Sequence, residues 1–231
     1  PNLDFRGFSG KIASGVIHRG DEVMALPSGK RSRVKEIVTY DGTPEYAFAP
    51  QSVTLTLEDE IDLSRGEMLI RPDNRPQAGH HIQAMLVWMD EQPMDRSQSF
   101  FLKHTTPPTR ARLGDIDYRV DITTKDQLPA ERLALNEIGL VSLSVADALL
   151  YDPYTENRAT GAFILIDPVT NYTSAVGMIL GADPRQTDTP DEDRIEISLA
   201  ELNIDESHRE AVERICEFLR ERGINIICTK K

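Results

Sequence analysis

The segment Ser28-Gly29-Lys30-Arg31 is the nearest approach in this sequence to a phosphate-binding loop. Such a loop needs a glycine, four further residues and then Gly-Lys-Ser/Thr, because backbone amides surround the phosphates and the hydroxyl binds magnesium. Here Met24 occupies the position of the first glycine, and Arg31 replaces the hydroxyl residue. The preceding Pro27 adds turn chemistry. We therefore interpret the segment as the solvent-exposed turn of a β-hairpin.

The tetrad Asp4-Phe5-Arg6-Gly7 has the Asp-x-x-Gly pattern with which GTPases contact a γ-phosphate. A pattern with only two fixed positions is common by chance. The Asn-Lys-x-Asp element that selects guanine occurs nowhere in the sequence. We therefore interpret the tetrad as ordinary chain and expect no nucleotide to bind there.

The histidines do not form a metal-binding pattern. His80 and His81 are adjacent at the start of an expected strand, where successive side chains point to opposite faces. His104 follows Lys103 at the end of another expected strand. We interpret His104 as a surface residue, with contact to a partner or a phosphate as the alternative. The remaining two histidines, His18 and His208, have no neighbouring residue at metal-ligand spacing.

Both cysteines, Cys216 and Cys228, lie near the C-terminus and form neither a metal-spaced cluster nor a disulfide framework. Cys216 falls on the apolar face of an expected helix, so we assign it to core packing, because a nucleophilic cysteine needs a positioned base. The sequence contains no Gly-x-Ser-x-Gly nucleophile motif and no carboxylate pair whose spacing indicates acid–base catalysis. It therefore predicts no catalytic, cofactor-binding or metal-binding residues.

The charge and the apolar content of the sequence limit the kinds of partner that the chain can bind. The 231 residues include 38 acidic and 26 basic ones, which gives a net charge of −12. A chain this acidic is repelled by phosphate backbones, so we expect it not to bind nucleic acid. No apolar run approaches the roughly 20 residues that span a bilayer, and the first residues do not resemble a secretory signal. Together with the absence of a disulfide framework, this predicts a cytoplasmic protein that does not enter a membrane.

Residues 1–73 are expected to form a small antiparallel β-barrel. Glycines recur every five residues at Gly10, Gly15 and Gly20, with β-branched stretches between them. Glycine supplies the positive φ that tight turns and bulges need. Segments with strand-like patterning follow, separated by turn residues. The expected strands are Glu22–Leu26, Ser32–Val38, Val53–Leu57 and Met68–Ile70.

A polar, proline-containing stretch, Arg71–Gly79, is expected to link this barrel to a second β-barrel at residues 79–181. Apolar segments separated by Pro, Gly, Asp and Asn are typical of an all-β domain. Short helical turns are also considered at Ala130–Leu135 and Ala146–Leu150. The expected strands are His80–Met89, Phe100–Leu102, Tyr118–Ile122, Leu140–Leu143, Phe163–Asp167 and Ser174–Leu180.

The C-terminal residues 185–231 differ in character and predict a small helix–strand extension of unknown role. Apolar residues follow helical spacing over Glu206–Arg222, with Asp205 as the N-cap and Gly223 just after the end. A strand is expected at Ile224–Ile227. The whole chain is thus predicted to be mainly β, with two consecutive antiparallel barrels and this extension.

The glycine-rich opening resembles the second domain of translation-type GTPases, a β-barrel that follows the nucleotide-binding domain. Two longer stretches narrow the resemblance. The first runs from Gly29 to Gly66 and includes Leu57-Glu58-Asp59-Glu60-Ile61-Asp62; the second is Asn157-Arg158-Ala159-Thr160-Gly161-Ala162-Phe163-Ile164-Leu165-Ile166-Asp167 with Gly177-Met178-Ile179. Over about residues 1–181 the chain is similar to the large subunit of bacterial heterodimeric sulfate adenylyltransferase, a GTPase related to elongation factors.

The resemblance implies a role in forming adenylyl sulfate from ATP and sulfate. In this family a small subunit carries the adenylyl-transfer site, and GTP hydrolysis on the large subunit drives the reaction. The residues that bind GTP and magnesium belong to an N-terminal domain that these 231 residues do not include. What the resemblance transfers to this chain is the two-barrel body, which supports the GTPase domain and contacts the small catalytic subunit. The chain itself is then a non-catalytic part of an enzyme.

Two alternatives remain open from the sequence. One is an elongation-factor-like fragment that binds tRNA, against which the acidic charge and the two specific stretches weigh. The other is a free-standing interaction module with no GTPase domain. In some members of the resembling family an adenylylsulfate kinase domain follows, but its phosphate loop is not found in residues 185–231.

Overall fold

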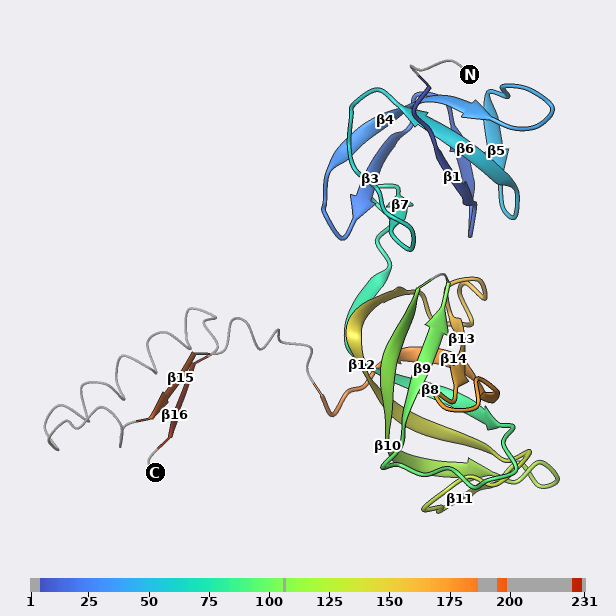
Figure 1. Ribbon diagram of the computed structural model, residues 1–231, viewed down its shortest axis with the longest axis vertical. Helices are drawn as coiled ribbons and strands as arrows, with labels where there is room; N and C mark the ends of the chain where they lie inside the picture. The colour runs from blue at the N-terminus through green and yellow to red at the C-terminus, as the bar shows by residue number, and fades with distance from the viewer. Residues whose placement is uncertain (1–4, 106, 187–194, 199–225, 230–231) are drawn as a thin grey trace, which may run out of the picture. The chain divides into compact units, whose positions relative to one another are not determined.

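The computed structural model of the chain describes residues 5–105, 107–186, 195–198 and 226–229. In these ranges every regular element is a β-strand (Figure 1). Contacts group residues 1–186 into one unit and residues 187–231 into another. The prediction of a mainly β chain is confirmed.

The first part of the chain forms a five-stranded antiparallel sheet in the order β1-β6-β4-β3-β7, together with the separate pair β2–β5. Two expected strands have the predicted bounds, and two others begin one residue earlier than expected. The short strands β1 and β2 lie in the glycine-spaced stretch that was expected to contribute short strands to the barrel, although without defined bounds, whereas β5 was not predicted. The strands are β1 (Phe8–Lys11), β2 (Val16–His18), β3 (Glu22–Leu26), β4 (Arg31–Val38), β5 (Tyr46–Phe48), β6 (Ser52–Leu57) and β7 (Met68–Ile70).

A compact apolar cluster fills this first domain. Side chains of β4 alternate between exposed and buried positions along most of the strand, as expected for a strand with one face on a core. Half-buried Ile17, Leu55 and Leu69 pack against the cluster. Its fully buried members come from four strands and are Val23, Val34, Ile37, Ala47 and Val53.

The second part of the chain is a closed antiparallel barrel. Six strands follow one another in the order β10-β12-β8-β14-β13-β9, and pairing of β9 with β10 closes the ring. Closure gives each of these six strands a neighbour on both sides, and the short β11 pairs with the C-terminal end of β10. The strands are β8 (Gln77–Trp88), β9 (Ser99–His104), β10 (Pro108–Val120), β11 (Gln127–Leu128), β12 (Ile138–Tyr151), β13 (Ala162–Ile166) and β14 (Thr173–Ala182).

The helical turns considered from the sequence are wrong. Ala146–Leu150 lies within β12, where a β-bulge between Ser144 and Leu149 interrupts the register with β8. The bulge inserts extra residues and breaks the period-two pattern, which hides the strand from sequence analysis. Ala130–Leu135 contains no helix. Likewise β10 begins ten residues before the expected strand at Tyr118, and two register shifts divide it.

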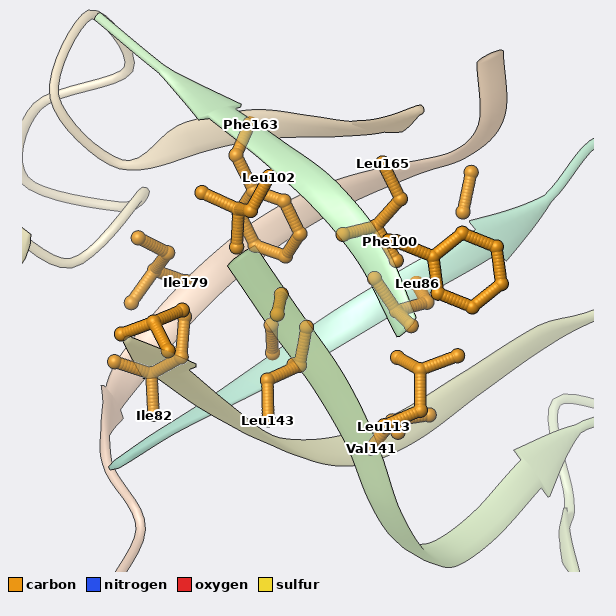
Figure 2. Packing of buried hydrophobic residues seen from close by; sticks show 14 of the residues in the cluster. Ile82, Leu86, Phe100, Leu102, Leu113, Val141, Leu143, Phe163, Leu165 and Ile179 are labelled. Atoms are coloured by element: carbon orange, nitrogen blue, oxygen red, sulfur yellow. The ribbon is translucent and has the colours of Figure 1, made fainter. Parts of the chain in front are cut away.

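The core of the second barrel contains more buried side chains than that of the first domain. Figure 2 shows part of this larger core. Trp88 meets Phe100 edge to face, with ring centroids 5.8 Å apart. Gly177 lies opposite Phe163 across the β13–β14 pair, and a Cβ at Gly177 would collide with the phenyl ring. The glycine therefore makes room for the aromatic side chain. Other fully buried members are Ile82, Leu86, Leu102, Leu143, Leu165 and Ile179.

The C-terminal unit contains two described strands, β15 (Ile195–Ser198) and β16 (Ile226–Thr229), which pair in parallel. The strand expected at Ile224–Ile227 overlaps β16, whereas β15 was not predicted. The helix expected at Glu206–Arg222 lies outside the described residues.

The closed core predicts a large cost for removing one of its central side chains. Leu165 is fully buried, so we expect Leu165→Ala to lower the free energy of unfolding by about 2–5 kcal/mol, through lost apolar burial and the cavity that remains. Urea denaturation followed by tryptophan fluorescence measures this, because Trp88 is in the same core. Val169→Ala on the surface is the control, with an expected change of less than about 0.5 kcal/mol. Equal effects of the two substitutions would contradict this packing.

Candidate functional site

The segment that approaches a phosphate-binding loop is a hairpin turn, as predicted. Gly29 has a φ of 71° in the connection between β3 and β4, and its N–H donates to the Ala25 carbonyl at 2.7 Å. Arg31 pairs with Glu22 at 3.2 Å, and Lys30 is exposed. A phosphate loop requires a strand-to-helix turn whose amides converge, and this hairpin does not provide one.

The tetrad at residues 4–7 also has a structural role. Arg6 donates to the Asp62 carboxylate at 2.8 Å and to the Ile61 carbonyl at 3.1 Å, which ties the start of the chain to the loop before β7. Asp4 lies outside the described residues. Within the described part of the chain, Arg6 therefore serves the fold.

The histidines occupy separate places. His80 interacts through Nδ1 with the Val145 carbonyl at 3.2 Å, and His81 with the Ser144 hydroxyl at 3.0 Å. The His18 ring lies against Tyr46 on the first domain. No group of three or more His, Cys, Asp or Glu side chains that could hold a metal is found in the part of the chain that the structure describes. His208 and Cys216 are outside that part, and Cys228 falls in β16.

The interpretation of His104 as a surface residue is wrong. The side chain is only 4% exposed and points into the second barrel, and its Nε2 donates to the Thr160 carbonyl at 2.6 Å. A carbonyl can only accept, so Nε2 carries the proton. Burial lowers the pKa of His104, opposed by the Thr160 carbonyl and the negative charge of Asp152. The imidazole is thus a neutral structural group inside the barrel.

The His104 partner belongs to the loop at residues 152–161, which a polar network makes rigid. Asp152 accepts from the Thr160 hydroxyl at 2.7 Å and from the Asn157 side-chain amide at 3.0 Å. Gly161 packs so closely on the Tyr154 backbone that a Cβ would collide with it. These contacts explain most of the Asn-Arg-x-Thr-Gly run by which the sequence resembled a known family.

Arg158 is the exception in this run. Its side chain is exposed, and its guanidinium lies 5.8 Å from the centre of the Tyr154 ring. Among the described residues it forms no ion pair. Arg158 is therefore a cation that the polar network of this loop leaves exposed to solvent.

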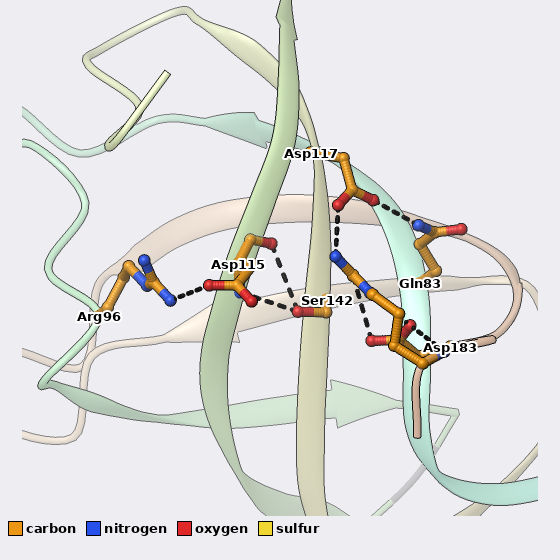
Figure 3. Close-up of polar contacts among 7 residues, drawn as sticks. Gln83, Arg96, Asp115, Asp117, Ser142 and Asp183 are labelled. Atoms are coloured by element: carbon orange, nitrogen blue, oxygen red, sulfur yellow. Dashed lines mark hydrogen bonds and ion pairs between the residues drawn. The ribbon is translucent and has the colours of Figure 1, made fainter. Parts of the chain in front are cut away.

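A second polar network lies on the outer side of β8, β10 and β12 (Figure 3). Arg96 pairs with Asp115, whose backbone N–H donates to the buried Ser142 hydroxyl at 2.9 Å. Arg185 bridges Asp117 at 2.5 Å and Asp183 at 2.9 Å, and its guanidinium lowers the pKa of Asp183 by hydrogen bonding. The network holds the chain in place where it leaves β14. Its cations and carboxylates are paired with one another.

Two exposed faces remain without such structural explanations. The pair β2–β5 places Val16 beside Phe48 and His18 beside Tyr46, and we call these four side chains the aromatic face. Its three apolar members are 43–56% exposed. Adjacent exposed apolar side chains are typical of surfaces that contact another polypeptide.

The other face is on the β9–β10 hairpin of the second barrel. Lys103, Arg110 and Arg112 are exposed on its outer side, and we call them the cationic face. Sequence analysis missed this face, although Arg110 and Arg112 stand two residues apart, because the strand that carries them was not predicted. Both faces are exposed, and the described residues hold no constellation that indicates bond-making chemistry. The described residues also include no helix long and apolar enough to cross a bilayer.

Comparison with known proteins gives strong similarity to one kind of enzyme subunit. Sulfate adenylyltransferase subunit 1 of Bacteroides fragilis is 54% identical over 226 residues, which cover 98% of this chain and 48% of the relative. The protein of the same name from Bacteroides thetaiotaomicron is 52% identical, with the same coverage of both chains. The chain thus spans about half the length of these relatives.

A family model and the solved structures of similar fold agree with this similarity. Residues 81–180 match the family described as GTP-eEF1A C-terminal domain-like. The crystal structure of sup35 complexed with GDP superposes with a TM-score of 0.67 at 17% identity, covering 76% of this chain and 43% of that one. At this identity the similarity concerns the fold alone. The resemblance to the large subunit of sulfate adenylyltransferase and to elongation factors, stated from the sequence, is confirmed.

The buried, neutral His104 predicts a specific pH dependence of stability. Its pKa is lowered in the folded protein, so below about pH 6.5, where histidine in the unfolded chain takes up a proton, the unfolded state binds more protons and stability falls. We expect His104→Gln to show a smaller loss of stability than wild type between about pH 7.5 and pH 5.5. Urea midpoints at the two pH values measure the difference. The same slope in both proteins would refute the assignment.

Proposed function

Because the chain is similar along 98% of its length to sulfate adenylyltransferase subunit 1, and residues 81–180 match the GTP-eEF1A C-terminal domain-like family, we propose that it is the barrel portion of such a subunit. In this proposal the protein takes part in sulfate activation, the formation of adenylyl sulfate from ATP and sulfate, in the cytoplasm. The observation that carries the proposal is 54% identity over 226 residues.

The two domains act as a scaffold in this proposal. GTP and magnesium bind to a separate domain of the parent polypeptide, and the adenylyl transfer takes place on a small catalytic partner subunit. The name subunit 1 of the relatives supports the existence of a partner. The chain's own contribution is mechanical: a closed barrel and a packed β-domain resist deformation and can transmit a movement from one partner to another.

The properties of the described residues support this division of labour. The polar clusters found, at the loop of residues 152–161 and around Arg185, have their groups engaged with one another. The aromatic face and the cationic face are exposed and suited to protein contacts. The high identity to the sulfate-activating relatives favours this function over a tRNA-binding elongation-factor fragment, for which only the fold argues.

The proposal predicts where activity resides. We expect the 231-residue chain alone neither to hydrolyse GTP nor to form adenylyl sulfate, because the groups for both reactions lie on other polypeptide. We expect the full-length subunit, purified with its partner subunit, to form adenylyl sulfate at a rate that depends on GTP. A coupled pyrophosphate-release assay with and without GTP measures this. Turnover of either nucleotide by the isolated chain, or no GTP dependence in the complex, would contradict the proposal.

A further inference from the structure

The cationic face is defined by the register of the β9–β10 hairpin. Lys103 lies opposite Pro108, and Arg112 lies opposite Ser99, with Arg110 between them. Alternate residues of the two strands, such as Leu102 and Ala111, are buried in the barrel core. Because side chains alternate along a strand, Lys103, Arg110 and Arg112 share the outer face. Three positive charges are therefore clustered on adjacent strands.

None of the three cations has an ion-pair partner among the described residues. The carboxylates of neighbouring elements are bound elsewhere. Asp115 is held by Arg96 and Asp117 by Arg185 (Figure 3), while three further carboxylates interact with uncharged groups. These interactions are Asp147 with the Thr109 hydroxyl, Asp152 with Thr160 and Asn157, and Asp167 with Gln98.

Apolar side chains lie beside these charges. The Arg110 guanidinium is 5.9 Å from the centre of the half-buried Phe101 ring. On the next strand, Ile164 pairs with Lys103 and Ile166 with Phe101, and both isoleucines are half-buried. Arginine and aromatic residues next to a small apolar strip form the composition found at the energetic centres of protein interfaces.

Like charges on neighbouring positions of a sheet repel one another and destabilise it. The chain carries a net charge of −12, so carboxylates are abundant, yet they do not neutralise this cluster. An external anion would remove the repulsion. Nucleic acid is disfavoured, because the acidic chain as a whole repels a phosphate backbone. Carboxylates on a folded partner suit the face better, since arginine binds them with two parallel hydrogen bonds.

We propose that the cationic face docks onto a carboxylate-bearing surface of the partner subunit, with Phe101 and Ile164 filling the apolar part of the contact. This inference rests on the proposed function, which supplies the partner. Lys103, Arg110 and Arg112 then determine the affinity and the salt dependence of the complex.

The test uses the full-length subunit and its partner subunit, with affinity measured by biolayer interferometry at several salt concentrations. The variant Lys103→Glu/Arg110→Glu/Arg112→Glu is expected to bind about tenfold or more weakly at roughly 100 mM salt and to lose the wild-type decrease of affinity with salt. The matched control, Lys30→Glu/Arg33→Glu/Lys35→Glu, changes the charge equally at exposed positions near and on β4. It should bind within about twofold of wild type.

Equal binding by the two variants would overturn the inference while leaving the proposed function intact. A wild-type subunit that binds no partner at all would instead overturn the proposed function. Thermal unfolding checks that the charge reversal folds; if it does not, the milder Arg110→Gln/Arg112→Gln pair decides, with an expected loss of about threefold or more. A fluorescence titration with tRNA completes the test, because tight, salt-sensitive binding that the triple variant abolishes would overturn the assignment to carboxylates.

Discussion

The pairing of β9 with β10 is the constraint on which the second domain depends. It closes six strands into a ring, so each of the six strands has a neighbouring strand on both sides. Closure also determines which side chains of the β9–β10 hairpin face the barrel interior and which face solvent. Leu102 and His104 are enclosed with the core, while Lys103 and Arg110 face solvent. The core, the buried histidine and the cationic face are therefore three consequences of one strand pairing.

Polar interactions complete the barrel where strand pairing stops. The loop at residues 152–161 lies between β12 and β13, and side-chain hydrogen bonds among Asp152, Thr160 and His104 supplement its backbone bonds to Ile179 of β14. Such a network is stable in a buried setting only when its members have partners, because an unpaired polar group loses its hydration without compensation. A motif that resembles part of an enzyme subunit is thus explained largely by the requirements of folding. Arg158 is the charged residue of this motif, and its side chain is exposed to solvent.

The distribution of charge separates structural from functional polar residues. Arg96, Arg119 and Arg185 are paired with carboxylates and hold strands or chain ends together. The cations of the β9–β10 hairpin have no such pairing among the described residues, and the aromatic face of the first domain is likewise unexplained by folding. A scaffold that works through its contacts is expected to concentrate its function in faces of this kind, because binding energy comes from surface that the fold itself leaves exposed.

The sequence by itself determined the mainly β class, the resemblance to sulfate adenylyltransferase subunits and most strands whose patterning is regular, such as β3 and β7. Tertiary structure decided the rest. The bulges in β10 and β12 disrupt the period of two, so their strands could not be located by alternation. His104 stands at a strand end next to a lysine, and only closure of the barrel shows that it is buried. The cationic face could not be identified without the tertiary structure either. Its residues come from two strands, and the local sequence does not specify the register between them.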